Sequence, residues 1–434
     1  MTTTTILTAL VVMLAVVLLL VALLLVLRDK LLPTGNVTIT INDDRQLQVP
    51  TGNSLISTLA EQQIYLPSAC GGKGSCGQCK CRVLSGGGSI LPTEVGFFKR
   101  KQQQEGWRLG CQVKVKEDMK IALPPSVLSV KKYECTVVSN RNVATYIKEF
   151  KVQLPPGEHM DFEPGSYAQI EIPRFDIRYA DFDRGLITNE YLPAWEQNRL
   201  FDLRCTNDEP TTRAYSMANY PAEGDVFMLT VRIATPPLRP DRSGFMNVNP
   251  GIASSYIFSL KPGDKVVMSG PYGEFHVKEH LTDVENTNAA ANSQFPEMIW
   301  IGGGAGMAPL RAQIMHLTRT LGIRDRAMHF FYGARALNEV FYPDDFQQLE
   351  KDFPNFHFHL ALDRPDSAAD QLGVPYTSGF VHQVMFNTYL RDHPSPEDIE
   401  YYMCGPGPMS AAVVEMLDDL GVPPENILYD DFGA

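Results

Sequence analysis

The feature that most constrains this chain is a loop of four cysteines among glycines, CGGKGSCGQCKC, at residues 70–81. The whole chain has eight cysteines. In a reducing compartment, clustered thiols indicate metal or redox chemistry rather than a disulfide framework. The loop therefore predicts a site in which sulfur atoms hold a metal centre.

The spacing of the cysteines favours one kind of centre. Cys70, Cys76 and Cys79 follow the pattern C-x5-C-x2-C on one loop, and Cys111 stands alone further along the chain. Structural zinc sites usually take two short pairs of ligands, whereas three ligands on one loop and one distant ligand suit a [2Fe–2S] cluster. We expect a cluster at these four residues, with zinc and ordinary reactive thiols as the alternatives. The pattern differs by one residue from the plant-type C-x4-C-x2-C.

The glycines and the fifth cysteine of the loop have separate roles in this interpretation. Glycines let backbone N–H groups turn toward the sulfur atoms, and such hydrogen bonds tune the potential of a cluster. Cys81 lies two residues beyond Cys79, where a strand is expected to begin. We expect Cys81 to pack beside the loop as a small apolar residue rather than to bind metal.

An apolar run extends from Ile6 to Leu27, with Thr8 as its only polar residue. At about 1.5 Å per residue, a helix over this run would span roughly 33 Å, which is enough to cross a bilayer. A cleaved signal peptide is the alternative, but it would have a shorter apolar core with positive charge before it. Here Arg28 and Lys30 follow the run. We expect a single-pass anchor, with the N-terminus outside and the remaining chain in the cytoplasm.

Length and residue patterns predict several domains after the anchor. The chain has 434 residues, too many for one ordinary core, and its formal net charge of -12 argues against nucleic-acid binding. The alternating segments NVTITI and RQLQVP and a short helical segment predict a small α+β unit, and later strand-like segments between Gly and Pro turns predict an antiparallel β-barrel. From about Glu297, a strand, a glycine loop and helices predict an α/β domain. The expected domains are 1–32, 33–129, 130–294 and 295–434, with surface insertions near 172–210, 236–250 and 277–294.

The segment Arg213-Ala-Tyr215-Ser216 carries the side chains that a flavin needs. Tyr215 could pack against the ring, Ser216 could lie near the nitrogen that takes a hydride, and Arg213 could bind the phosphates. Alone the motif is weak, because an Arg and a Tyr on a strand more often lie at the surface and in the core. A small-residue run from Gly251 to Ser254 then opens a helical stretch, whose N-terminus could receive a pyrophosphate. The ordered set predicts a bound flavin.

A glycine loop at 302–309, GGGAGMAP, follows a strand-like segment and precedes an amphipathic helix. A strand, a glycine loop and a helix start form a dinucleotide-binding cradle, although Pro309 stands where the usual fingerprint has its third glycine. Two later strand ends, at 332–335 and 402–409, are expected at the same edge of the sheet. The expected nicotinamide-binding residues are Gly302, Gly303, Gly304, Gly306, Pro309, Arg335, Cys404, Gly405 and Pro406.

Some alternatives stay open around this edge. Cys404 is either a buried structural thiol or a residue beside the nicotinamide. Arg335 follows a strand at a place where it could hold the 2′-phosphate of NADPH, so spacing does not decide between NADH and NADPH. His357 and His359 are not expected to bind a metal, because no carboxylate or third histidine clusters with them in the sequence.

Together these motifs make the chain resemble the F subunits of sodium-translocating NADH:quinone oxidoreductases. The resemblance covers the whole chain and rests on the C-x5-C-x2-C loop, on RAYSMANYP, GGGAGMAP, EYYMCGP and YDDFGA, and on the insertion before RAYS. It implies a multidomain fold with one N-terminal transmembrane helix and a ferredoxin-like, α+β [2Fe–2S] domain of the β-grasp type. An antiparallel β-barrel FAD domain and an α/β Rossmann-like NADH domain of the ferredoxin–NADP reductase type would follow.

The resemblance also implies an activity. NADH would give a hydride to FAD, and single electrons would pass through the [2Fe–2S] cluster to other subunits of a membrane complex. They would end on a quinone, coupled to Na+ export across the inner membrane of a bacterium. A hydride carries two electrons and a cluster accepts one, so a flavin must stand between them.

The resemblance assigns roles to particular residues as well. FAD would lie against Arg213, Tyr215 and Ser216, with its pyrophosphate at the run from Gly251 to Ser254. Phe432 would cover the flavin ring and move aside for the nicotinamide. The expected catalytic residues are Tyr215, Ser216, Cys404 and Phe432.

Two other functions are compatible with the same modules. The chain could be a membrane-anchored NAD(P)H reductase that feeds an oxygenase, or an electron-carrier or docking subunit with a vestigial flavin site. The apolar run argues against the first function, and the intact order of the flavin and nicotinamide motifs argues against the second. We also expect the 172–210 insertion to dock a partner subunit, since a loop of that length needs a purpose.

Overall fold

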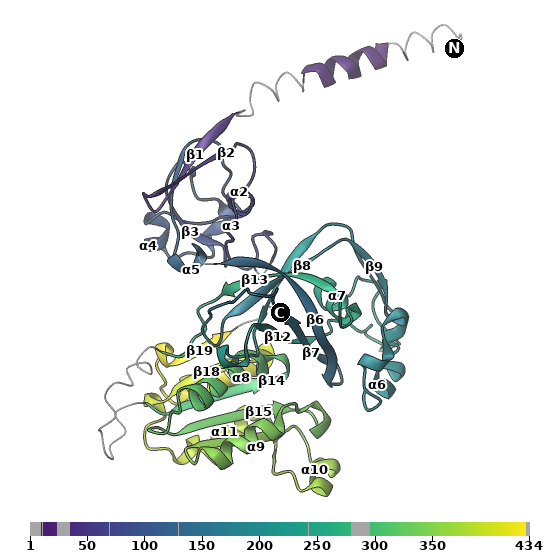
Figure 1. Cartoon of the computed structure of the whole chain (residues 1–434), viewed down its shortest axis with the longest axis vertical. Helices are drawn as coiled ribbons and strands as arrows, with labels where there is room; N and C mark the ends of the chain where they lie inside the picture. The colour runs from purple at the N-terminus through teal and green to yellow at the C-terminus, as the bar shows by residue number, and fades with distance from the viewer. Residues whose placement is uncertain are drawn as a thin grey trace. The chain divides into compact units, whose positions relative to one another are not determined.

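The computed structural model describes residues 10, 12–23, 35–68, 70–128, 130–241, 243–278 and 296–430. These residues form two compact units, 1–130 and 131–434 (Figure 1). The expected division of 130–434 into two domains stays a prediction, because these residues form one compact unit that contains both a barrel and an α/β sheet.

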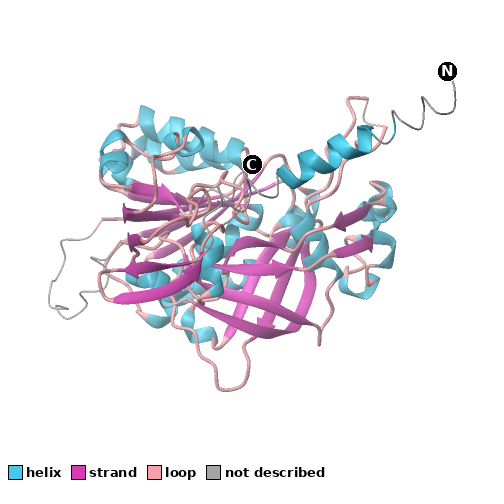
Figure 2. Ribbon diagram, turned by 90° about the horizontal axis from the view of Figure 1, so that it is seen from above, coloured by secondary structure: helices cyan, strands magenta, loops and turns pink. Residues whose placement is uncertain are grey.

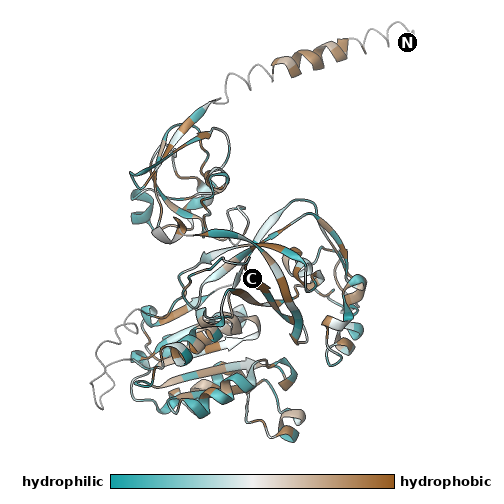
Figure 3. Ribbon diagram, viewed as in Figure 1, coloured by the Kyte–Doolittle hydropathy of each residue, from teal (hydrophilic) through white to brown (hydrophobic). Residues whose placement is uncertain are grey.

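The N-terminal apolar run falls only partly within the described residues. Residues 12–23 are helical, with exposed side chains, and this helix is coloured as hydrophobic in Figure 3. Across the described ranges, no helix has both the length and the apolar character needed to span a bilayer.

The first unit is built on a mixed sheet in the order β2-β1-β5-β3-β4. A hairpin joins β1 (Asn36–Ile41) to β2 (Arg45–Pro50), and its turn places Asn42 and Asp43 at φ 51° and 57°. Both residue types tolerate these angles, and the two alternating segments of the sequence form this antiparallel hairpin. The other strands are β3 (Lys80–Ser85), β4 (Trp107–Leu109) and β5 (Met119–Ala122), of which β5 runs parallel to β1.

Alternation along the strands of this sheet supplies the core of the first unit. Ile39, Ile41, Leu47 and Val49 point inward from the hairpin. The helix α2 (Leu55–Glu61) buries Leu55 and Leu59 in the same core. Shorter helices are α3 (Pro92–Val95), α4 (Arg100–Gln104) and α5 (Pro125–Leu128). A hairpin, a helix and a parallel central strand form the β-grasp arrangement that the resemblance implies.

The second unit begins with an antiparallel sheet in the order β11-β8-β13-β6-β7-β12. A bridge between Met217, directly after β11, and Leu229 of β12 links the two ends of this sheet, so the sheet closes into the predicted barrel (Figure 2). Its strands are β6 (Lys131–Ala144), β7 (Ile147–Gln153), β8 (Tyr167–Ile172), β11 (Thr211–Ser216), β12 (Val226–Arg232) and β13 (Lys265–Tyr272). The helix α7 (Ile252–Ser259) packs into the barrel core through Ile257 and Phe258.

The segment predicted as a surface insertion at 172–210 has structure of its own. It contains the antiparallel strands β9 (Phe175–Arg178) and β10 (Arg204–Asn207) and the helix α6 (Leu192–Gln197). Tyr179 and Trp195 are fully buried, and the Trp195 indole donates to the carbonyl of Thr145 at 2.7 Å. The insertion is therefore packed against the barrel rather than simply looped out. Residues 279–295, within which most of the expected 277–294 insertion falls, lie outside the described residues.

The α/β part of the second unit has one parallel sheet in the order β17-β16-β15-β14-β18-β19. Its strands are β14 (Met298–Gly303), β15 (Met328–Ala334), β16 (Phe356–Leu362), β17 (Thr377–Ser378), β18 (Glu400–Cys404) and β19 (Ile427–Asp430). The helices are α8 (Met307–Met315), α9 (Pro343–Asp352), α10 (Ser367–Leu372), α11 (Val381–Thr388) and α12 (Gly407–Asp419). Residues of α8 and α9 share one core with the sheet, and residues of α11 and α12 share another, so helices cover both faces.

The order of the strands reverses at β14, because β15 lies on one side of it and β18 on the other. Doubly wound sheets bind ligands outside the carboxyl ends of the strands at such a switch point. The predicted Rossmann-like arrangement is confirmed. It places the loop after β14 and the loop after β18 side by side.

Candidate functional site

The cysteine loop lies between α2 and β3, in a backbone conformation that requires glycine. Gly71, Gly72, Gly74 and Gly77 have φ values of 66°, 82°, 79° and 67°. Side chains other than glycine rarely adopt this left-handed region. The glycine content read from the sequence therefore has a direct structural cause.

The four predicted ligands lie as two pairs. The Sγ atoms of Cys70 and Cys76 are 3.4 Å apart, and the thiols of Cys79 and Cys111 are hydrogen-bonded to each other. Within the described ranges, no three or more His, Cys, Asp or Glu side chains form a group that could hold a single metal ion. Two thiol pairs instead fit a binuclear cluster held by four thiolates, with two on each iron.

The pKa values of these thiols show how the loop supports thiolates. Burial alone would raise the pKa of the Cys70 thiol, but hydrogen bonds from Ser75 and Cys76 outweigh burial and lower it to about 6. The hydrogen bond between Cys79 and Cys111 lowers the pKa of Cys111 to about 7 and raises that of Cys79. Burial raises the pKa of the Cys76 thiol as well. Thiolates are the ligands of iron, and in each pair one thiol, that of Cys70 or Cys111, has a lowered pKa.

Cys81 lies apart from these pairs, as the sequence predicted. It is fully buried on β3, and its Sγ lies 3.9 Å from the carbonyl oxygen of Arg108. Burial raises the pKa of its thiol to about 12. This thiol stays protonated at neutral pH and acts as a core side chain.

Arg108 and Glu94 form a buried ion pair close in sequence to Cys111, which the sequence analysis did not predict. Arg108 binds Glu94 at 2.8 Å, and both side chains are almost fully buried. Glu94 also accepts the backbone N–H of Leu109 at 2.8 Å, while Arg108 donates to the carbonyls of Gly87 and Gly88. Burial would raise the pKa of Glu94, but the hydrogen bonds from Arg108 and the backbone outweigh it and lower the pKa. The pair fixes β4, which leads directly to Cys111.

The predicted flavin strand is β11, paired with β8 in the barrel. Ser216 at its end is buried, and its hydroxyl donates to Oδ2 of Asp430 at 2.6 Å. Burial raises the pKa of Tyr215 and keeps its phenol neutral. Arg213 bonds only to Thr211 and Thr212 among the contacts of the described residues, with no carboxylate paired to it. Its positive charge is available to an anion such as a phosphate.

The helix α7 begins at the predicted small-residue run, with Gly251 as its N-cap. The Ser254 hydroxyl accepts the N–H of Ala234 at 3.0 Å and donates to the carbonyl of Gly251 at 3.1 Å. A Cβ on Gly251 would lie 2.6 Å from that of Ala234. Because the Ser254 hydroxyl is engaged inside the turn, what this run offers a phosphate is the backbone N–H groups of the first helical turn.

The glycine loop after β14 is pressed against the loop after β18. A Cβ on Gly306 would lie 2.0 Å from the carbonyl oxygen of Cys404, and one on Gly405 would lie 2.4 Å from Cε of Met409. Gly304 has φ 56°, and its carbonyl accepts the hydroxyl of Tyr332 at 3.3 Å. The loop thus brings bare backbone to the carboxyl edge of the sheet, where the phosphates of a dinucleotide bind. Pro309 lies buried in the first turn of α8.

The flavin strand and the nicotinamide edge meet at one place. In the register of the sheet, Cys404 pairs with Gly302 on one side and with Asp430 on the other. Asp430 in turn accepts the hydroxyl of Ser216. The structure therefore brings Ser216, Cys404 and Gly302 together through Asp430, which the sequence analysis did not select. Its one sequence signal is that it falls within the YDDFGA segment.

The remaining predicted residues stand further out. Cys404 is fully buried at the end of β18, so its backbone and not an exposed thiol edges the site. Arg335 is exposed just beyond β15. Phe432 lies outside the described residues.

The sequence-based reason for setting His357 and His359 aside was wrong. His329 Nδ1 lies 3.0 Å from His359 Nε2, and His329 Nε2 lies 3.6 Å from Oε1 of Glu297. A third histidine and a carboxylate therefore do cluster there. The parallel pairing of β15 with β16, in which Phe331 lies opposite His359, creates this contact. The spacing of the histidines along the sequence does not reveal it.

Protein-family comparisons match three parts of the chain. Residues 39–116 match the 2Fe-2S iron-sulfur cluster binding domain, residues 197–277 the oxidoreductase FAD-binding domain, and residues 300–415 the oxidoreductase NAD-binding domain.

Curated relatives match nearly the whole chain. The chain is 50% identical over 410 residues to the F subunit of the Na(+)-translocating NADH-quinone reductase of Klebsiella pneumoniae, and the match covers 94% of each chain. It is 49% identical over 409 residues to the protein of the same name from Pseudomonas aeruginosa, again with 94% of each chain covered.

Solved structures show a similar fold at low sequence identity. The Amycolatopsis cytochrome P450 reductase GcoB has a TM-score of 0.60 at 22% identity, covering 91% of this chain and 98% of its own. The ferredoxin reductase in carbazole 1,9a-dioxygenase has a TM-score of 0.55 at 22% identity, covering 92% of this chain and 98% of its own.

Proposed function

Because the chain belongs to the family of F subunits of the Na(+)-translocating NADH-quinone reductase, we propose that it is the electron-input subunit of that membrane complex. It oxidises NADH through FAD and passes electrons through a [2Fe–2S] cluster to other subunits, ultimately to a quinone. The observation that carries this proposal is the junction of Ser216, Asp430 and Cys404, where the flavin strand reaches the switch point of the nicotinamide sheet.

The chemistry of the bound groups explains the order of the sites. FAD, when bound, takes up two electrons with a hydride and returns them one at a time, and a [2Fe–2S] cluster carries one electron. The cluster would be held by Cys70, Cys76, Cys79 and Cys111, whose thiol pairs fit it.

The side chains of the chain itself bind and orient the reactants. Arg213 neutralises phosphate charge, and the first turn of α7 adds backbone N–H groups. Tyr215, kept neutral by burial, offers a flat ring against the flavin. The Ser216 hydroxyl, held by Asp430, has a fixed direction at the end of β11. Because its one proton is donated to Asp430, the Ser216 oxygen can act there as a fixed acceptor. A fixed dipole near the reacting atoms avoids reorganisation during hydride transfer.

The nicotinamide side of the site is built from backbone. The glycines of the loop after β14 let a pyrophosphate approach closely, and Gly405 and Pro406 border the same edge. Cys404 borders this edge through its backbone, because its side chain is buried in the core of the sheet. We propose that Arg335, exposed beyond β15, contacts the adenosine end of NADH, and that Phe432 covers the flavin ring.

The membrane placement belongs to the same proposal. The apolar run from Ile6 to Leu27 would anchor the chain once across the bacterial inner membrane, with its N-terminus outside. The soluble units would then face the cytoplasm, where NADH is available. The other membrane subunits of the complex are the partners, and Na+ transport is a property of the whole assembly.

The test uses the full-length chain, purified in detergent and as part of its complex. We expect flavin absorbance, a binuclear iron signal in electron paramagnetic resonance after dithionite reduction, and reduction of ferricyanide by NADH. In the complex, quinone should replace ferricyanide as acceptor. A protein that binds flavin and iron but supports no quinone reduction in its complex would favour a reductase that serves an oxygenase.

A further inference from the structure

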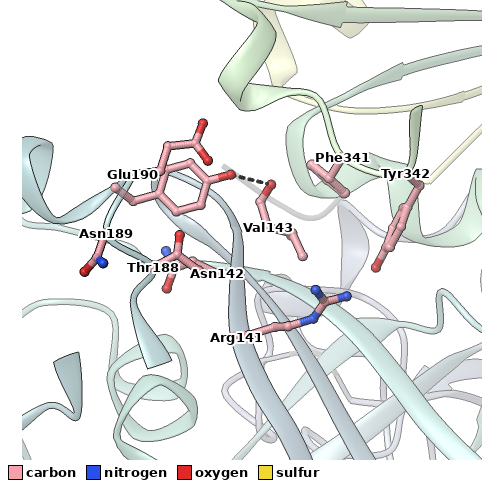
Figure 4. A pocket seen from close by; sticks show the side chains of 9 residues that line it. Arg141, Asn142, Val143, Thr188, Asn189, Glu190, Phe341 and Tyr342 are labelled. Atoms are coloured by element: carbon pink, nitrogen blue, oxygen red, sulfur yellow. Dashed lines mark hydrogen bonds between the residues drawn. The ribbon is translucent and has the colours of Figure 1, made fainter. Parts of the chain in front are cut away.

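A pocket of about 530 Å³ opens where three parts of the second unit meet (Figure 4). One wall comes from the end of β6, one from the insertion and one from the loop before α9. Its lining includes Arg141, Asn142, Val143, Glu190, Tyr191 and Tyr342. None of these is a residue proposed for FAD, NADH or the cluster.

One of the lining residues, Asn142, has an acceptor without a donor. Asn142 is only 4% exposed, and its amide Nδ2 donates to the carbonyls of Ala144 and Thr145. Its Oδ1 is buried and has no hydrogen-bond partner among the described residues. An unpaired buried acceptor is unfavourable, and an N–H donor that reached it would remove this cost.

The charged residues of the lining are Arg141 and Glu190, and a buried carboxylate behind the lining neutralises Arg141. Arg141 is paired with Glu149 at 3.3 Å, and the same carboxylate accepts the Tyr342 hydroxyl at 2.7 Å. Glu190, on the insertion, has no ion-pair partner in the part of the chain that the structure describes. An anionic ligand would meet Glu190, whereas a cation would find a carboxylate that is not already paired.

The walls are aromatic and firmly held. The Tyr191 hydroxyl donates to the carbonyl of Val143 at 3.1 Å, and the guanidinium of Arg311 lies 5.0 Å from the centre of the Tyr342 ring. Tyr342 has φ 61°, a strained conformation for a bulky residue and one that is typical of functional sites. Aromatic rings beside a carboxylate favour an organic cation.

We propose that this pocket receives a lysine or arginine side chain from a cytoplasmic loop of another membrane subunit of the complex. The inference rests on the proposed function, which places this unit at the cytoplasmic face of the membrane. Cytoplasmic loops of membrane proteins carry an excess of lysine and arginine, and this chain has a formal net charge of -12. The incoming N–H groups bind Asn142 Oδ1 and the Glu190 carboxylate.

The experiment compares Glu190→Gln, Glu190→Lys and a matched control in the assembled complex. Glu190 is exposed, so its replacement leaves the fold intact. The control is Glu196→Gln, which removes the same charge from the same insertion but outside the pocket. The readout is the NaCl concentration at which the chain dissociates from the detergent-solubilised complex, together with its affinity for the complex without this subunit.

We expect Glu190→Gln to weaken association by about three- to tenfold and Glu190→Lys to weaken it further, with Glu196→Gln unchanged. NADH–ferricyanide activity should stay the same in all three variants. Equal association of the Glu190 and Glu196 variants would overturn the inference and leave the proposed function standing. If the unaltered chain showed no NADH–ferricyanide activity, the proposed function would be overturned instead.

Discussion

The cysteine loop and the Ser216–Asp430 junction are built in opposite ways. The loop gathers three of its four predicted ligands within ten residues, and its glycines at positive φ set the turns locally. The junction joins residues 214 positions apart through a closed barrel and a parallel sheet. A locally encoded site should fail when one ligand is lost, whereas an assembled site should fail by degrees as contacts between distant elements weaken.

The largest expected effect comes from a substitution in the cysteine loop, which should disable the cluster and leave the Ser216–Asp430 junction unaffected. Cys76→Ala removes one sulfur of the Cys70–Cys76 pair, and three thiolates cannot complete the set of four cysteine ligands that a [2Fe–2S] cluster needs. We expect complete loss of the binuclear iron signal, with the rate of flavin reduction by NADH unchanged in stopped-flow absorbance. Cys81→Ala is the control and should keep the cluster, since that thiol lies in the core. Loss of flavin reduction in a folded Cys76→Ala protein would show that the two sites are not separable.

The next prediction tests the close contact between the loop after β14 and the loop after β18. In Gly306→Ala the new Cβ would lie 2.0 Å from the carbonyl oxygen of Cys404, and backbone cannot yield as a flexible side chain does. We expect kcat/KM for NADH to fall on the order of 10²-fold, because small misplacements of a bound substrate are costly. The matched control is Gly407→Ala, whose Cβ would meet nothing within 4 Å. Similar kinetics for the two variants would contradict a tight contact between the loops.

The contrast between the two sites also explains what could be read from the sequence. The cysteine pattern, the glycine loop and the alternating strands depend on neighbouring residues, and each led to the correct element. Asp430, the Glu94–Arg108 pair and the contact of His329 with His359 depend on register between distant strands and loops. The buried packing of the insertion through Tyr179 and Trp195 was missed for the same reason, since nothing in its sequence indicates which core it joins.

A third prediction weakens the assembled site by one contact. Asp430→Asn keeps the shape of the side chain but replaces a charged acceptor for Ser216 by a neutral one. Hydrogen bonds to charged groups contribute about 1.5–3 kcal/mol, so we expect the rate of flavin reduction to fall roughly tenfold. Ser216→Ala should cost about as much, and the double variant little more, because both remove one interaction. Additive losses in this cycle, or equal losses from Asp419→Asn on exposed α12, would refute the coupling.

The last prediction concerns pH and the histidines that the pairing of β15 with β16 brings together. Burial, together with the nearby histidines, lowers the pKa of His329 to about 3, and burial with His357 lowers that of His359 to about 4. The unfolded chain binds these protons below pH ~6.5, whereas the folded chain binds them only near pH 3–4. Stability is therefore lost as pH falls below ~6.5, by up to about 1.4 kcal/mol per pH unit for each histidine.

Hydrogen exchange of the amides in β15 and β16 would measure this loss locally. Between pH 7.5 and 5.5, after correction for the intrinsic exchange rate, protection of these strands should fall by ~2.7 kcal/mol relative to the barrel strand β6. His359→Gln keeps a polar partner for His329 but removes one titrating ring, so it should flatten the dependence. His382→Gln, which lies outside this cluster, should leave it unchanged. Protonation of histidines buried between β15 and β16 should destabilise that sheet before the barrel. An equal loss of protection in β6 would therefore show that the pH effect belongs to the whole unit and would contradict this prediction.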